Sequence, residues 1–228
     1  RLRAHAQIRQ HQLPVAHLDA VYFDTPDHDL AAHKITLRRR TGGTDAGWHL
    51  KLPAGADART EVRLPITAAR ESVPEELRDI VLAIVRDRSL QPVARIETER
   101  TVFMLHAPDD TELAEFCDDH VSSDTFEGRE PVTWREWEIE LVEGDAAFLA
   151  SVAGVVEDAG GSPSDETKLA KALGDRVPVR PERVVPRPTR ESSISALSLA
   201  PARGMPAIIC GRTTFSSAEN SGSRWWNW

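Results

Sequence analysis

Alternation of apolar and charged residues over the first three quarters of the chain constrains its fold most strongly. In the clearest segment, 134–141, Glu136, Glu138 and Glu140 alternate with apolar residues. Side chains two apart on a strand share a face, so the pattern predicts strands with one charged and one apolar face. The predicted strands are 17–24, 34–41, 47–53, 58–66, 93–105, 112–121 and 134–142. Turn-forming residues separate them, which indicates an antiparallel meander.

Helical periodicity marks three further segments. One follows Pro74, a residue that a first helical turn tolerates, and runs to residue 84. A second follows Asp145 and ends before a glycine pair, and a third covers 164–173. Long strands with helices at their edges indicate an α+β protein. The chain has no GxGxxG or GxxxxGK sequence, which argues against a nucleotide-binding α/β fold.

Length and composition favour one domain followed by a tail. A chain of 228 residues with 40% hydrophobic residues can bury one core but is short for two linked domains. Residues 1–175 hold the patterned segments and carry a net charge of −13, from 20 Lys/Arg and 33 Asp/Glu. Residues 176–228 are rich in Pro, Arg and Ser, carry a net charge of +5 and lack periodicity. We therefore expect a folded domain over 1–175 and a disordered tail over 176–228.

The charge and the hydropathy pattern exclude several classes of partner. An acidic body argues against nucleic-acid binding, which depends on Lys and Arg that neutralise backbone phosphates. No segment approaches the roughly 20 apolar residues that span a bilayer, and the first residues lack the features of a secretory signal. We expect a cytoplasmic protein without a membrane partner. Cys117 and Cys210 have no CxxC spacing, so the sequence predicts neither a zinc site nor a disulfide.

Basic residues form a row on the early strands. Arg38 and Arg40 share one face of their strand, and His49 and Lys51 share one face of the next. The opposite face of 48–52 is apolar and must contact a hydrophobic layer, which leaves the charged face pointing the other way. On any single strand, a sheet face in contact with solvent is the favoured explanation of this pattern. Arginine and lysine are also the side chains that bind phosphate, as a planar fork and as a point charge.

Acidic residues form a second row on the late strands. Glu136, Glu138 and Glu140 share one face, and Glu115 and Asp119 share a face of the preceding strand. Like charges at this spacing repel, so we expect cations beside them. The basic row or divalent cations can supply that charge, since carboxylates are the ligands that Mg²⁺ and Mn²⁺ prefer. A closed barrel with both rows inside would suit a metal-bound triphosphate.

Several motifs follow one another in an order that resembles a known family. They are Tyr22-Phe23-Asp24-Thr25-Pro26, Leu37-Arg38-Arg39-Arg40, Trp48-His49-Leu50-Lys51-Leu52-Pro53, Glu115 to Asp119, Glu136-Trp137-Glu138-Ile139-Glu140-Leu141 and Thr167-Lys168. Over residues 15–174 their order and spacing resemble the CYTH domain, also called the triphosphate tunnel metalloenzyme family, and most of all its actinobacterial members. The resemblance implies an eight-stranded antiparallel barrel around a charged tunnel, with flanking helices.

The resemblance also implies roles for individual residues. Basic residues would grip the phosphates: Arg38, Arg40, Lys51, Arg59, Arg100 and Lys168. Acidic residues would bind one or two Mg²⁺ or Mn²⁺ ions: Glu115, Asp119, Glu136, Glu138 and Glu140. The residues with catalytic roles would be Glu138, Glu140 and Lys51. One ion would orient the triphosphate and a second would lower the pKa of the attacking water.

One departure from the family concerns its first strand, which reads ExExK and has no counterpart in this sequence. We therefore expect a barrel that lacks its first strand, through truncation or through loss. A missing strand leaves an unpaired edge, which favours self-association into a homodimer. Loss of several ligands at once also predicts reduced activity, because such groups act as a unit.

Three functions are compatible with the sequence. The first is metal-dependent hydrolysis of inorganic triphosphate, thiamine triphosphate or a nucleoside triphosphate. The second is a non-catalytic module that binds polyphosphate. The third is an adenylyl cyclase of the class IV type, which would share the phosphate and metal groups and would also need to recognise adenine. The sequence identifies no site for a base, so the hydrolase is the leading hypothesis.

Overall fold

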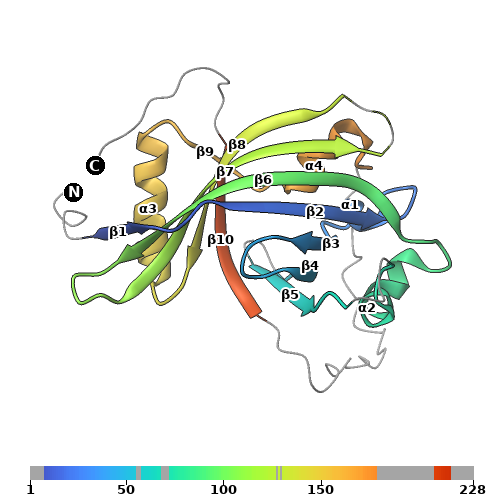
Figure 1. Cartoon of the computed structure of the whole chain (residues 1–228), viewed down its shortest axis with the longest axis horizontal. Helices are drawn as coiled ribbons and strands as arrows, with labels where there is room; N and C mark the ends of the chain where they lie inside the picture. Colours follow the sequence, from blue (N-terminus) through green and yellow to red (C-terminus); the bar gives the residue numbers. More distant parts are fainter. Residues whose placement is uncertain are drawn as a thin grey trace, which may run out of the picture.

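The computed structural model describes residues 8–54, 58–67, 72–126, 128, 130–178 and 208–216. An antiparallel sheet curls into a barrel, with helices beside it (Figure 1). Its long strands are β2 (Ala16–Asp24), β3 (Thr36–Thr41), β4 (Gly47–Pro53), β5 (Ala58–Leu64), β6 (Gln91–His106), β7 (Glu112–Thr125), β8 (Val132–Leu141) and β10 (Ile208–Ser216). The short strands β1 (Arg9–Gln12) and β9 (Ser162–Ser164) extend the sheet.

Four helices and one turn of 3-10 helix accompany the described strands. They are α1 (Asp29–Ala32), α2 (Glu75–Val85), α3 (Ala146–Asp158), α4 (Lys168–Leu173) and the 3-10 turn Gly174–Arg176. The arrangement is α+β, as the alternation and the helical periods predict. No helix in the described part of the chain is long and apolar enough to cross a membrane.

Antiparallel pairs join the eight long strands into a ring. Strands β2 to β5 are successive neighbours, and β6 lies between β2 and β7. Strand β8 pairs with β7. The first half of β10 pairs with β5 and its second half pairs with β8, so the two ends of the sheet are joined through β10. Joining the ends matters because an unpaired strand edge exposes backbone hydrogen-bonding groups.

Strand β10 lies in the range 176–228, where the sequence predicts a disordered tail. It lies between β5 and β8 in the sheet. Its β-branched and aromatic residues suit a strand, but the surrounding Pro, Arg and Ser obscure this preference. The rest of the predicted tail beyond residue 178 lies outside the described residues. The predicted domain end at 175 falls within the 3-10 turn Gly174–Arg176.

Helices α2 and α3 cover two separate parts of the outer surface of the barrel. The apolar residues of β3, β4 and β5 form a core with Leu77, Val81 and Val85 of α2, which are spaced four apart and at most 1% exposed. In the same way, Ile139 of β8 packs with α3. Each such side chain contributes roughly 1.5–3 kcal/mol by leaving water. The apolar rows therefore face outward to the helices, and the charged rows face the inside of the barrel.

Helix α4 packs against a different surface, at the inner face of the sheet. Its residues Leu169 and Leu173 are buried in a cluster with Ala20, Tyr22 and Ile96 of β2 and β6. The same three strand residues line an internal pocket of the barrel. Helix α4 therefore carries its first residue, Lys168, into the interior.

Deletion of residues 179–228 should test the closing role of β10. Without β10, strands β5 and β8 would expose unpaired edges, so we expect dimers or larger species and an unfolding midpoint lower by roughly 5–10 °C. Light scattering after size exclusion and thermal denaturation measure both effects. Deletion of only 217–228, which keeps β10, is the matched control. A monomeric 1–178 fragment with an unchanged midpoint would contradict the role of β10.

Candidate functional site

A basic pocket lies inside the barrel. Arg38 and Arg40 of β3 line it together with Arg100 of β6 and Lys168 of α4, four of the six residues predicted to bind phosphate. Apolar and polar side chains of β2 and β6 complete the lining: Leu18, Ala20, Tyr22, Ile96 and Thr98. Arg38 donates a hydrogen bond of 3.1 Å from Nη1 to the Tyr22 hydroxyl. Four cations from three separate elements therefore converge on one cavity.

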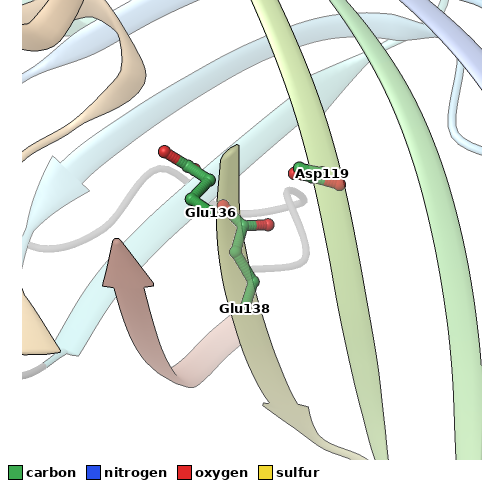
Figure 2. Close-up of side chains that lie close together, drawn as sticks. All are labelled: Asp119, Glu136 and Glu138. Atoms are coloured by element: carbon green, nitrogen blue, oxygen red, sulfur yellow. The ribbon is translucent and has the colours of Figure 1, made fainter. Parts of the chain in front are cut away.

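Three buried carboxylates lie next to this pocket. Asp119 of β7 and Glu136 and Glu138 of β8 are at most 2% exposed. Each offers an oxygen within 4.8 Å of the others (Figure 2). The alternation of the two strands brings them together, because Glu136 is the cross-strand partner of Asp119 and Glu138 lies two residues further along. We call this group the acidic trio; in the described residues it is the group with the geometry to hold a metal ion.

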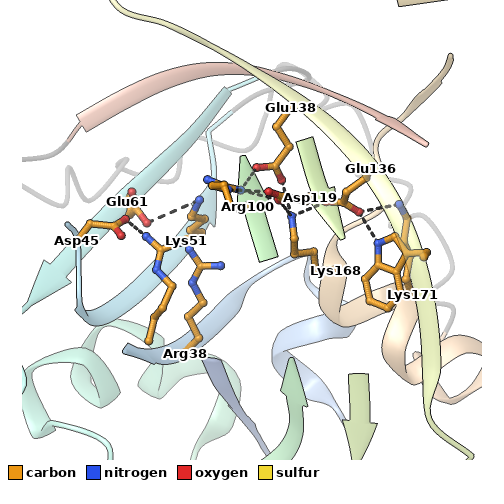
Figure 3. A network of polar contacts seen from close by, with 12 residues as sticks. Arg38, Asp45, Lys51, Glu61, Arg100, Asp119, Glu136, Glu138, Lys168 and Lys171 are labelled. Carbon is orange, nitrogen blue, oxygen red and sulfur yellow. Dashed lines mark hydrogen bonds and ion pairs between the residues drawn. The ribbon is translucent and has the colours of Figure 1, made fainter. Parts of the chain in front are cut away.

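Arg100 and Lys168 bind the acidic trio directly. Arg100 forms two parallel hydrogen bonds to Asp119, of 2.7 and 2.6 Å, and also contacts Glu138. The ammonium of Lys168 lies 2.9 Å from Asp119 and 2.7 Å from Glu138, and it donates to Glu136 as well. The two cations thus contact the trio and line the basic pocket (Figure 3).

The start of helix α4 fixes the position of Lys168. The hydroxyl of Thr167 accepts a hydrogen bond of 3.1 Å from the backbone N–H of Ala170, as an N-cap residue does. Lys168 is therefore the first helical residue. The buried side chains of Leu169 and Leu173 hold the helix against the sheet. The Thr167-Lys168 motif thus combines a cap with the cation that it positions.

Lys171 and Trp134 also bind the trio, and the sequence analysis missed both. Lys171 Nζ lies 2.9 Å from Glu136, and the Trp134 indole N–H donates to the same carboxylate at 2.6 Å. Lys171 Nζ also lies 5.8 Å from the centroid of the Trp134 ring. Spacing could have identified both residues, since Lys171 follows Lys168 by three on a helix and Trp134 precedes Glu136 by two on a strand.

The cations keep Asp119 and Glu136 ionised. Burial would raise the pKa of Asp119, but the charges and hydrogen bonds of Lys168 and Arg100 outweigh it and hold this pKa well below its usual range. In Glu136, burial is likewise outweighed by Lys168 and Lys171, so its pKa is lowered. Burial would lower the pKa of Arg100, but the hydrogen bond and charge of Asp119 raise it. Neutral pH therefore leaves Asp119, Glu136 and Arg100 charged.

A second cluster surrounds Glu61 on β5. Its carboxylate lies 2.9 Å from His49 Nδ1, 3.7 Å from Lys51 Nζ and 2.6 Å from Arg63 Nη2. Burial would raise the pKa of Glu61, but these neighbours hold it well below its usual range. Burial lowers the pKa of His49 to about 4, despite its hydrogen bond to Glu61. Figure 3 shows Glu61 on the opposite side of Lys51 from the trio.

Four predicted site residues, Glu115, Glu140, Arg59 and Lys51, neither line the pocket nor belong to the trio. Glu115 and Glu140 face each other across β7 and β8, beyond the trio. Arg59 donates to the backbone carbonyl of Lys34 at 3.3 Å. Lys51 contacts Glu61 rather than the trio. Of the five predicted metal ligands, the structure therefore gathers Asp119, Glu136 and Glu138.

Asp24, in the first of the family-like motifs, stabilises a backbone turn. It is fully buried and accepts hydrogen bonds from the backbone N–H groups of Thr25, Leu30 and Ala31. These bonds fix the turn after β2 and the start of α1.

Comparison with known proteins agrees with this geometry. Residues 1–167 match the family model of the CYTH domain. The chain belongs to the CYTH family. CYTH proteins bind triphosphate substrates and depend on a metal, and the acidic trio of this CYTH domain could hold one.

Two relatives come from Mycobacterium tuberculosis. They are the uncharacterized protein MT2285 of strain CDC 1551 / Oshkosh and the uncharacterized protein Rv2226 of strain ATCC 25618 / H37Rv. Each is 50% identical to this CYTH chain over 188 residues. The match covers 76% of the chain and 37% of each relative, so the chain spans little more than a third of their length.

Acid should destabilise the folded protein by protonating Asp119 and Glu136. The pKa values of Asp119 and Glu136 are lowered from 3.8 and 4.5, so their stabilisation is complete above about pH 4.5 and is lost as the pH falls further. We expect the free energy of unfolding in urea to drop by roughly 1–3 kcal/mol between neutral pH and about pH 3. Glu136→Gln should reduce this pH dependence. A variant with an undiminished slope would show that other groups cause the acid sensitivity.

Proposed function

We propose that this CYTH domain binds a triphosphate together with Mg²⁺ or Mn²⁺ and hydrolyses its terminal anhydride bond. The observation that carries the proposal is a pair of buried donors. The Nε atoms of Arg38 and Arg40 are inaccessible to solvent and have no hydrogen-bond partner among the described residues. A buried donor without an acceptor is costly, so two such donors beside one pocket support a site for an anion.

The charges around the pocket also favour an anionic ligand. Burial, together with repulsion from Arg38 and Arg100, lowers the pKa of Arg40 to about 9. A polyphosphate would relieve that repulsion, because its oxygens accept paired hydrogen bonds from guanidinium groups. A triphosphate offers enough oxygens for Arg38, Arg40, Arg100 and Lys168 at once.

The acidic trio fits a divalent cation by its donor chemistry. Carboxylate oxygens are the ligands that Mg²⁺ and Mn²⁺ prefer, and Mg²⁺ commonly combines one or two carboxylates with phosphate oxygens. Asp119, Glu136 and Glu138 would hold the ion. When bound, it would neutralise phosphate oxygens and lower the pKa of a water.

Arg100 and Lys168 would link the two halves of the site. Both contact the trio and line the basic pocket. When a triphosphate and a cation enter, these side chains would turn from the carboxylates to phosphate oxygens. Water then attacks the terminal phosphorus, the bond to the bridging oxygen breaks, and inorganic triphosphate yields orthophosphate, diphosphate and a proton. The residues mainly position the ligand and neutralise its charge, which is what phosphoryl transfer requires.

Arg38→Ala should weaken the binding of inorganic triphosphate by roughly 10-fold to 100-fold, because it removes a buried charge-assisted donor. Calorimetric titration measures this affinity at two salt concentrations. Arg39→Ala is the matched control, since Arg39 has the same charge and points to the opposite face of β3. Equal affinities of wild type and both variants would overturn the ligand assignment.

The reaction products decide between the candidate functions. Release of orthophosphate from triphosphate in the presence of Mg²⁺ or Mn²⁺ is the result we expect. Binding without release would favour a non-catalytic polyphosphate module. One observation supports that second candidate: Arg100, Lys168 and Lys171 already pair with the whole trio. Formation of a cyclic nucleotide and diphosphate from ATP would instead identify a cyclase.

The metal site should depend on Glu138 more than on Glu140. Glu138 belongs to the trio, whereas Glu140 lies two residues beyond it on the same strand. We expect Glu138→Gln to weaken Mn²⁺ binding by roughly tenfold or more, and Glu140→Gln to change it much less. Calorimetric Mn²⁺ titration of both variants, with thermal denaturation to confirm folding, measures the difference. Equal losses of Mn²⁺ affinity in the two variants would show that Glu140 is also a metal ligand.

A further inference from the structure

An acidic side chain from a hairpin loop reaches one of the pocket arginines. Asp45 lies in the loop 42–46 between β3 and β4, and its carboxylate forms an ion pair with the Arg40 guanidinium. The Arg40 side chain is 7% exposed, whereas that of Asp45 is 31% exposed. Figure 3 places Asp45 beside Glu61, at the end of the network opposite Lys171. The pair therefore joins a buried cation to an anion at the edge of the site.

The backbone of this loop is held in place. Gly42 and Gly43 have positive φ angles of 77° and 72°, which favour glycine. A Cβ atom on Gly42 would lie 2.0 Å from the carbonyl oxygen of His17, so the loop packs closely on β2. The carbonyl oxygen of Asp45 lies 2.8 Å from His49 Nε2. Asp45 can therefore release Arg40 by rotating its side chain, without movement of the loop.

Asp45 and a phosphate ligand would need the same group. A guanidinium binds carboxylate and phosphate oxygens through the same N–H fork. Arg40 is buried near Arg38 and Arg100, whose charges oppose its own. The carboxylate of Asp45 supplies negative charge to this cluster in the ligand-free protein.

We infer that Asp45 is an internal competitor for the phosphate subsite at Arg40, and that a ligand gains this subsite only by displacing it. The inference rests on the proposed function, because it concerns the same pocket. Displacement costs the interaction energy of the Arg40–Asp45 pair. A multiply charged polyphosphate ligand can offset this cost through its contacts to Arg38, Arg100 and Lys168. Asp45 therefore acts as a specificity determinant that disfavours weakly charged anions at Arg40.

Asp45→Asn tests the competition directly. The variant should bind inorganic triphosphate roughly tenfold more tightly than wild type in calorimetric titration at fixed ionic strength, since the ligand no longer breaks an ion pair. In an Arg40→Gln background, the same substitution should leave the affinity unchanged. Asp79→Asn, at an exposed position on α2, removes the same charge elsewhere and should not tighten binding.

Each outcome decides something. Equal or weaker binding by Asp45→Asn overturns the competition and leaves the proposed function standing on the wild-type titration. Equal tightening by Asp79→Asn also overturns it, because net charge alone would explain the gain. Absence of binding by wild type and variant overturns both proposals. If Asp45→Asn does not fold alone, folding on addition of triphosphate but not of sodium chloride supports the inference, and failure to fold with either refutes it.

Discussion

The ammonium of Lys168 among three buried carboxylates is the interaction on which the interior of this CYTH domain depends. Burying any one of these carboxylates without a partner would cost several kcal/mol. Lys168 and Arg100 contact both Asp119 and Glu138, and so they hold β6, β7, β8 and α4 around one centre. The same two cations face the pocket that Arg38 and Arg40 line. Charge balance and the proposed ligand recognition therefore depend on the same side chains.

The strands achieve this by keeping their two faces chemically separate. The apolar faces of β3, β4 and β5 contact α2, and that of β8 contacts α3. Because both helices lie outside the barrel, the charged faces point inward, toward one another and toward any ligand. Helix α4 is the exception, because it packs against the inner face and brings a cation from outside the sheet. The result is an enclosed polar site supported by an outer hydrophobic layer.

Much of this arrangement follows from sequence period alone, and the exceptions have physical causes. Alternation predicts the strands and the separation of their charged and apolar faces. It does not predict how far along β8 the acids stay together, because register and barrel curvature place Glu140 and Glu115 beyond the trio. Asp45 reaches its partner from a loop, where periodicity carries no information. Strand β10 was missed because its surroundings lack any pattern.

The position of β10 in the chain has a kinetic consequence. Ile208 pairs with Glu61, and Arg212 pairs with Glu140, so the ring is joined by contacts between residues remote in sequence. Such contacts form slowly, because the entropy of closing a long loop is lost before any pairing compensates for it. The hairpins from β2 to β5 and from β6 to β8 can assemble earlier from local contacts. Completion of the ring would then be the late, rate-limiting step in folding.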